Sequence, residues 1–231
     1  MIIQCKELNK YYGKTHALKN VNLNIEQGRI IGLLGPNGSG KTTLIKILNN
    51  LLEQNDGLIE INGAKPGVES KKAIAYLPDC NYLNLNATPN DLINFFSEFY
   101  DNFNVDKANQ LLAKLNLNPH AKLKTMSKGT IEKVQLSLVM ARDAQVYILD
   151  EPIAGVDPAS RDFILDTILS NLQAGKTLII STHLINDIEN ILDEVIFIQN
   201  GNILLHENCD SLREKHGMSI DRIFREEFRC Y

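Results

Sequence analysis

The segment Gly35-Pro36-Asn37-Gly38-Ser39-Gly40-Lys41-Thr42-Thr43 is the strongest indication of the fold in this sequence. It matches the phosphate-binding pattern G-x-x-x-x-G-K-[ST] and lies between an apolar run and an apolar helical stretch, as that pattern requires. Glycines let backbone N–H groups converge on phosphate oxygens, and the following helix adds its positive end. Lys41 then supplies charge, and the Thr42 hydroxyl can ligate Mg²⁺. The alternative, a glycine-rich turn without a ligand, fits this context poorly.

Four short, almost wholly apolar runs have the composition of strands that are buried on both faces of a parallel sheet. They are residues 29–34, 146–149, 177–180 and 195–198. Between the last two runs, Leu184, Ile188 and Leu192 fall at helical spacing, so strand, helix and strand alternate. Asn200 and Gly201 predict a tight hairpin into one further strand. The sequence therefore predicts an α/β fold with a P-loop NTPase core and a mixed sheet.

Apolar residues are spaced differently at the start and in the middle of the chain. Residues 21–25 alternate between apolar and polar, which predicts a strand with one wet face, and we expect an antiparallel β subdomain at the N-terminus. Thr88 followed by Pro89 is a helix start, and helical spacing continues to about residue 142. We predict a single domain with an α/β core over 1–87 and 143–206, an inserted α-helical subdomain over 88–142 and a short helical tail over 207–231. Within that tail, residues 221–229 are typical of a solvated amphipathic helix.

A second half of a phosphate-transfer site is expected at the end of another buried strand. The run 146–149 is followed directly by Asp150 and Glu151. Asp150 is predicted to hold Mg²⁺ through water, and Glu151 is placed to polarise an attacking water. The alternative is an exposed acidic strand end, which would be favoured if the P-loop were absent.

With these motifs in order, nearly the whole chain resembles the ATPase subunits of ABC transporters. That family has an L-S-G-G-Q signature opening a helix, a D-loop after the catalytic glutamate and a histidine after the next strand. Here residues 126–130 (MSKGT), residues 154–157 (AGVD) and His183 stand at those places. The resemblance implies a head-to-tail dimer in which ATP is held between Lys41 of one copy and Ser127 and Gly129 of the other.

The resemblance also implies which residues complete the site. His183 would act with Glu151 in catalysis, and Tyr12 occupies the place of the aromatic that stacks on adenine in this family. A tyrosine packed in the core is the alternative for Tyr12. The guanine-reading N-K-x-D of small GTPases does not occur in the sequence, so ATP is the expected nucleotide, with Mg²⁺.

The family pattern is not matched at Lys128, Thr130 and Asp79, among other positions. Lys128 replaces a glycine and Thr130 the glutamine of the signature, while Ser127 and Gly129 remain. Ser127 and the helix N-terminus can still meet a γ-phosphate, and Lys128 adds positive charge nearby. Where relatives usually carry glutamine, Asp79 provides a harder oxygen ligand that can still reach Mg²⁺.

An aromatic cluster begins just past Asp79, on the helix that starts near Pro89. It consists of Phe95, Phe96, Phe99, Tyr100 and Phe103. Aromatic residues at this density are most often the core of a small subdomain. The resemblance implies the alternative, a surface that receives a helix from an integral membrane permease subunit.

Composition narrows the class of protein. The 231 residues carry 24 Lys and Arg against 28 Asp and Glu, a net charge of −4, which argues against a nucleic-acid partner bound through a general basic surface. No apolar run reaches the roughly 18–20 residues that cross a bilayer, and the first residues lack a signal core. We expect a cytoplasmic protein, held at the inner face of the membrane by its partner. Its four cysteines are widely spaced, which favours free thiols.

Taken together, the sequence predicts an ATP-binding and hydrolysing subunit of an ABC transporter that drives a separate membrane subunit. Its short C-terminus and helical insert look most like ABC-2-type bacterial systems, often exporters. The ATPase subunits would form a homodimer or a heterodimer. The alternative is a soluble ABC-type ATPase that remodels a macromolecule. A P-loop kinase is a third interpretation, but it leaves Ser127 and His183 unexplained.

Overall fold

The computed structural model of the protein describes residues 1–228. Residues 229–231, which include Cys230 and the last residue of the predicted tail helix, lie outside the described part. The elements in chain order are β1 (Ile3–Tyr12), β2 (Thr15–Ile25), β3 (Ile30–Leu34), α1 (Lys41–Leu48), β4 (Asp56–Ile61), α2 (Val68–Ala73), β5 (Ile74–Leu77), α3 (Pro89–Phe99), α4 (Val105–Ala113), the 3₁₀ turn η1 (Leu123–Thr125), α5 (Lys128–Met140), β6 (Val146–Asp150), α6 (Pro158–Asn171), β7 (Thr177–Ser181), α7 (Ile185–Ile188), β8 (Glu194–Gln199), β9 (Asn202–Asn208), α8 (Cys209–His216) and α9 (Ile220–Glu227).

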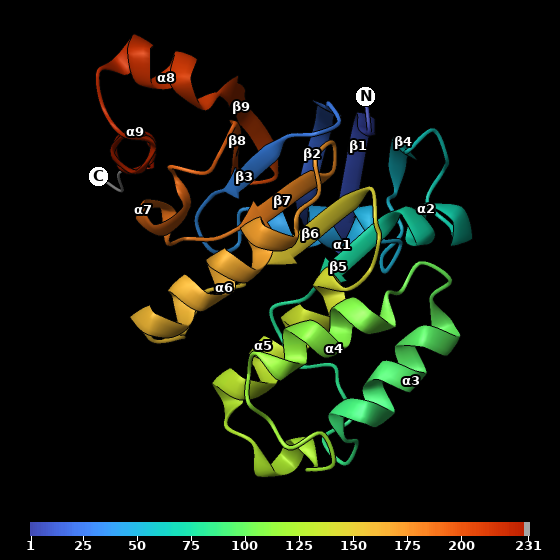
Figure 1. Ribbon diagram of the computed structural model, residues 1–231. Helices are drawn as coiled ribbons and strands as arrows, with labels where there is room; N and C mark the ends of the chain where they lie inside the picture. Colours follow the sequence, from blue (N-terminus) through green and yellow to red (C-terminus); the bar gives the residue numbers. More distant parts are fainter. Residues whose placement is uncertain (229–231) are drawn as a thin grey trace.

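Two sheets organise these elements (Figure 1). The smaller sheet is antiparallel with strand order β2-β1-β4, and the larger one has the order β5-β6-β7-β3-β8-β9. Neighbours in the larger sheet are parallel except β8 and β9, which form an antiparallel hairpin. The hairpin residues Asn200 and Gly201 have φ values of 49° and 82°, as a tight type I′ turn requires. The predicted mixed sheet and N-terminal antiparallel subdomain are confirmed.

Helix α1 is packed between the smaller sheet and one face of the larger one. Its buried side chains Leu44, Ile45, Ile47 and Leu48 share a core with strands of both sheets. Burial of each such side chain is worth about 1.5–3 kcal/mol. The start of α1, where the phosphate-binding loop ends, is therefore held from two sides.

The opposite face of the larger sheet is covered by helices α5, α6 and the C-terminal helices. Helices α3, α4 and α5 form a separate small core, seen as the green and yellow-green helices of Figure 1. Thr88 caps α3 as predicted, because its hydroxyl accepts from the N–H of Asp91 while the Asp91 carboxylate accepts from the N–H of Thr88. Helices α4 and α5 contribute to both cores, α4 through Leu111 and α5 through Leu136 and Val139 on the side of the sheet, so they connect the helical subdomain to the sheet.

Arg142, just after α5, fastens the helical subdomain to the core. Its side chain is only 5 % exposed. The guanidinium donates to the carbonyls of Ile74 (2.6 Å) and Lys71 (3.2 Å) and to the side-chain oxygen of Asn102 (3.2 Å). It also lies 3.9 Å from the ring centre of Tyr100. One cation therefore joins the end of α2, the start of β5 and the aromatic cluster of the helical subdomain.

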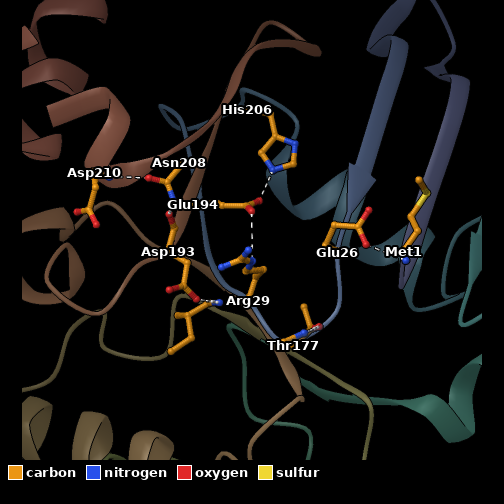
Figure 2. Close-up of polar contacts among 11 residues, drawn as sticks. Met1, Glu26, Arg29, Thr177, Asp193, Glu194, His206, Asn208 and Asp210 are labelled. Atoms are coloured by element: carbon orange, nitrogen blue, oxygen red, sulfur yellow. Dashed lines mark hydrogen bonds and ion pairs between the residues drawn. The ribbon is translucent and has the colours of Figure 1, made fainter. Parts of the chain in front are cut away.

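A polar network fixes the end of the larger sheet that lies opposite the phosphate-binding loop (Figure 2). The Glu194 carboxylate lies 2.8 Å from His206 Nε2 and 3.7 Å from Arg29 Nε. Next to it, the Asp193 carboxylate accepts from the N–H of Ile30 at 2.8 Å. These contacts set where β3 and β8 begin, and thus the register of the strand that leads into the loop.

The C-terminal helix α9 differs in part from the prediction of a solvated helix. Its charged side chains are largely exposed, but Ile220 and Ile223 are buried. Phe224 and Phe228 pack on Phe197 of β8, with ring centres 5.5 and 5.6 Å apart. The apolar face of an amphipathic helix is stabilised by any apolar surface within reach, and here the edge of the large core provides it. The prediction was wrong for this face.

We expect Arg142→Met to lower the free energy of unfolding by about 2–4 kcal/mol, because it leaves buried carbonyl oxygens without a donor. Urea unfolding followed by circular dichroism measures this loss. Arg222→Met is the matched control, because Arg222 is exposed and pairs with Glu226 on the same helix, and its effect should stay within about 0.5 kcal/mol. Equal losses in the two variants would contradict the role of Arg142.

Candidate functional site

The phosphate-binding loop leaves the carboxyl end of β3 and enters α1 at Gly40. Gly40 has φ 114°, and a Cβ there would lie 3.0 Å from the carbonyl oxygen of Ala17. At Gly35 a Cβ would lie 2.2 Å from the carbonyl oxygen of Ile198. Glycine is therefore needed at both ends of the loop, for backbone conformation at one and for close approach at both.

Lys41 lies inside the curl of this loop. Its side chain is 7 % exposed, and its ammonium donates to the carbonyls of Gly35 (2.7 Å) and Pro36 (3.3 Å). Burial lowers the pKa of Lys41, while the nearby charges of Glu151 and Asp150 oppose that shift. A buried ammonium held mainly by carbonyl dipoles favours an anionic ligand such as a phosphate.

Asp150 stands at the end of β6, with 1 % of its surface exposed. One carboxylate oxygen accepts from the hydroxyl of Ser181 on β7, and the other oxygen is buried without a hydrogen-bond partner in the described part of the chain. Burial raises the pKa of Asp150, and the Ser181 hydrogen bond opposes it. An orphaned carboxylate oxygen on the same cavity wall as the Thr42 hydroxyl fits Mg²⁺, which prefers such hard oxygen ligands.

Glu151 is held in an uncommon conformation beside Asp150. Its φ is +52°, which a non-glycine residue adopts at a cost of about 1–3 kcal/mol. Its N–H donates to the carbonyl of Ser181 at 2.9 Å, and its carboxylate lies 2.9 Å from Nδ1 of His183. Because a carboxylate only accepts, Nδ1 is the donor. The carboxylate is thus oriented by the ends of β6 and β7 and by a histidine.

These groups meet in a cavity of about 610 Å³, a size that suits a nucleotide. The predicted residues that line it are Asn37, Gly38, Ser39, Gly40, Lys41, Thr42, Thr43, Asp79, Asp150 and Glu151. The residues that sequence patterns missed are Thr15, His16, Ala17, Lys19 and Asn200. The loop, both strand-end carboxylates and Asp79 therefore share one site.

A larger cavity of about 1150 Å³ adjoins this site. Its core side includes Gly35, Pro36, Asn37, Asp79, Glu151 and His183, and its helical side includes Met126, Lys128 and Gln135. Ser127 and Gly129 line neither cavity. Ser127 instead caps α5, where its hydroxyl accepts from the N–H of Thr130 at 3.2 Å. The structure thus leaves the signature residues of a subunit outside that subunit's own nucleotide cavity.

Tyr12 also lies outside the cavity lining. It is 48 % exposed at the end of β1, with the ammonium of Lys10 5.4 Å from its ring centre, so it is not a core tyrosine. Its contact with adenine stays a prediction. The aromatic side chain that does line the cavity is His16, whose ring stacks on Tyr11 at 4.0 Å.

The hairpin at Asn200 and Gly201 explains why residues of β2 reach the cavity. Gly201 donates its N–H to the carbonyl of Ser39 (2.8 Å), and its own carbonyl accepts from the N–H of Lys19 (2.8 Å). The sequence indicated this hairpin but contains no signal for its contact with the loop, because hydrogen bonds between distant backbones leave no pattern of side chains.

Comparison with known proteins gives a consistent result. Residues 18–154 match the family described as ABC transporter. An ABC transporter ATP-binding protein of Methanocaldococcus jannaschii is 31 % identical over 218 residues, covering 92 % of this chain and 80 % of that protein. The lantibiotic transport ATP-binding protein SrtF of Streptococcus pyogenes is 29 % identical, covering 99 % of this chain and 100 % of its own.

A solved structure shares the fold. It is the dimeric structure of an ATP-binding cassette in a post-hydrolysis state with ADP and Pi bound, and it matches 90 % of this chain and 98 % of its own with a TM-score of 0.78. At 24 % sequence identity the likeness concerns the fold, which agrees with the fold predicted from sequence.

We expect Glu151→Gln to keep ATP binding and to slow turnover by at least about a hundredfold, because the amide accepts a hydrogen bond from water but is a far poorer base. ATPase rates and the mass in solution with ATP and Mg²⁺ measure both effects, and ATP-trapped dimers should accumulate. Glu53→Gln, which lines neither cavity, is the control and should leave both unchanged. Normal turnover in Glu151→Gln would remove Glu151 from catalysis.

Proposed function

This chain belongs to the ATP-binding subunits of ABC transporters, a family of ATPases, and we propose that two such subunits close around ATP and Mg²⁺ and drive an integral membrane partner. The observation that carries the proposal is the convergence of Lys41, Asp150 and Glu151 on one nucleotide-sized cavity. The helix that Ser127 caps lies outside that cavity.

The residues predicted to form the site have distinct tasks in this proposal. Lys41 and the loop N–H groups bind the phosphates, while Thr42, Asp79 and Asp150 hold Mg²⁺. The metal, when bound, neutralises charge on the phosphate oxygens. Glu151 orients and polarises the attacking water, and His183 keeps the Glu151 carboxylate in place through their 2.9 Å contact. Tyr12 would approach the adenine from the exposed end of β1.

The dimer follows from the position of Ser127. Its helix N-terminus carries a positive dipole end, which favours an anion, yet it lines no part of its own subunit's nucleotide cavity. A second subunit in a head-to-tail arrangement would bring the N-terminus of its α5, with Ser127, Lys128 and Gly129, onto the γ-phosphate. ATP would then join the two subunits, and hydrolysis would release them. The partner subunit is a second copy or a related chain.

The aromatic cluster divides into a buried part and an exposed part. Phe96 belongs to the core of the helical subdomain, whereas Phe95 and Phe99 are 58 % and 67 % exposed and stack on each other. A pair of exposed aromatic rings on one helix face is typical of a protein-binding surface. We assign this surface to the membrane subunit. This contact would hold the protein at the inner face of the cell membrane. Within residues 1–228, no helix is long and apolar enough to cross a membrane.

An exporter is the proposed kind of transporter, because SkfE of Bacillus subtilis, which is 31 % identical over 209 residues, is a peptide export ATP-binding protein. A soluble ATPase that remodels a macromolecule is not favoured, since the relatives named above are ATP-binding proteins of transporters. No nucleic acid partner is proposed.

A mixing experiment tests the shared sites. Lys41→Ala removes the charge set against the phosphates, and Ser127→Arg places a bulky side chain where the γ-phosphate would dock. Each variant alone should be inactive as an ATPase, while Ser127→Arg monomers still bind ATP. Mixed in equal amounts, the two variants form dimers in which one site carries both defects and the other carries none. ATPase activity should therefore return in part.

Each variant measured alone, at the same total concentration as the mixture, is the control and should stay inactive. Isotope-labelled chains and native mass spectrometry verify that mixed dimers form. Mixed dimers without activity would contradict independent shared sites, and a Ser127→Arg monomer with normal turnover would contradict shared sites altogether.

The membrane partner is tested by co-purification of the tagged chain from detergent-solubilised membranes. We expect an integral membrane protein to accompany the native chain and its amount to fall at least about fivefold with Phe95→Ser and Phe99→Ser combined, because exposed aromatic anchors carry much of an interface's energy. Leu169→Ser, at an exposed leucine of α6, is the control. Recovery of the native chain without any membrane protein would contradict the transporter assignment.

A further inference from the structure

The nucleotide cavity contains more negative than positive side chains. Its lining has two lysines, Lys19 and Lys41, and three carboxylates, Asp79, Asp150 and Glu151. Lys41 is already engaged by two carbonyl oxygens of the loop. The net charge of the lining is therefore negative, like that of a triphosphate that enters without a cation.

One of these carboxylates has an oxygen that no donor within residues 1–228 satisfies. The second oxygen of Asp150 is buried and has no hydrogen-bond partner. The negative charges of Asp79 and Glu151 act on the same group: after burial, the main cause, both raise the pKa of Asp150. Asp79 and Glu151 therefore lie close enough to Asp150, on the lining of one cavity, for their charges to repel its carboxylate, and a divalent cation would relieve this repulsion.

The chain by itself offers this cation no complete site. Within residues 1–228, no group of three or more His, Cys, Asp or Glu side chains is placed to hold a metal ion. A Mg²⁺ ion needs octahedral coordination and usually takes part of it from substrate phosphates. Metal and nucleotide would therefore complete each other's binding site.

We propose that the carboxylate of Asp79 makes ATP binding conditional on a divalent cation, so that the chain admits the metal–ATP complex and rejects free ATP. This inference rests on the proposed function and adds a rule for its ligand. We assign this rule to Asp79, the exposed metal-holding carboxylate on the loop after β5 that lines both cavities. Asp150 is buried and bonded to Ser181, and Glu151 acts on the attacking water, so their charges cannot be removed without a change in the sheet or in the reaction. A neutral amide in place of Asp79 would leave two lysines against two carboxylates.

The sign of the effect follows from the charges. Without metal, the Asp79 carboxylate repels the polyphosphate across the cavity that both would share. With Mg²⁺ bound, the same carboxylate faces a cation and attracts it. Removing the charge should therefore strengthen binding of free ATP and leave binding of MgATP equal or weaker.

The experiment is isothermal titration calorimetry of the full chain with ATP, in Mg²⁺ and in EDTA at constant ionic strength. For the native chain we expect Mg²⁺ to raise the ATP affinity at least about a hundredfold. In Asp79→Asn this gain in affinity should be at least about tenfold smaller, mainly because ATP binds more tightly in EDTA. Asp79→Glu, which keeps the charge, should keep the native gain. Asp101 lines neither cavity, so Asp101→Asn removes a charge elsewhere and should also keep the native gain in ATP affinity from Mg²⁺.

Several results would overturn the inference. A native chain that binds ATP equally well in Mg²⁺ and in EDTA, or that binds Mg²⁺ tightly without ATP, contradicts the inference. So does an Asp79→Asn chain whose ratio of ATP affinity in Mg²⁺ to that in EDTA equals the native ratio. A loss of this ratio in Asp79→Glu or Asp101→Asn also contradicts it. If Asp79→Asn does not give a folded monomer, Asp79→Gln takes its place with the same expected values. A native chain that fails to bind MgATP would instead refute the proposed function. The two failures are therefore distinguishable.

Discussion

The packing of α1 between two sheets is the constraint on which the phosphate-binding loop depends. One face of the helix is buried by the antiparallel sheet and the other by the parallel strands, so the helix start cannot shift without opening a core. The loop is also bonded from the side, because Gly201 donates to the Ser39 carbonyl. Backbone N–H groups that must converge on an anion gain from such rigidity, since little reorganisation is then needed on binding.

The pairing of β6 with β7 sets the chemistry at the other side of the cavity. Asp150 lies opposite Ser181 in the parallel register, and this one pairing supplies a hydroxyl for Asp150 and a carbonyl for the N–H of Glu151. A shift of one residue would turn both carboxylates to the wrong faces of the sheet. The positive φ of Glu151 persists because the surrounding strands determine it, which is common where a side chain must be aimed. His183, two residues beyond β7, completes the orientation.

Predictions from sequence were accurate where a local pattern carried the information. The apolar runs are the strands β3, β6, β7 and β8, and Thr88 caps α3. Strands β4 (DGLIEI) and β5 (IAYL) were not predicted, because the first is short and contains Gly57 and the second is only four residues long. The solvation of α9 was misjudged because an apolar face does not tell which surface covers it. The aromatic cluster proved to be divided, with Phe96 inside and Phe95 outside, and only the packing of α3 on α5 decides which ring is which.

The α/β fold, the phosphate-binding loop, the two strand-end carboxylates and the order of the family's motifs were all predictable from the sequence. These features are local: each depends on residue types at fixed spacing, which periodicity and backbone sterics translate directly into structure. Three features became visible in the folded chain alone: His16 and Asn200 line the cavity, Tyr12 lies outside its lining, and Ser127 belongs to neither cavity of its own subunit. The physical reason is that such contacts join segments far apart in the chain. Their geometry is set by strand register, helix packing and a hairpin's hydrogen bonds, none of which is written in the residues of a single segment.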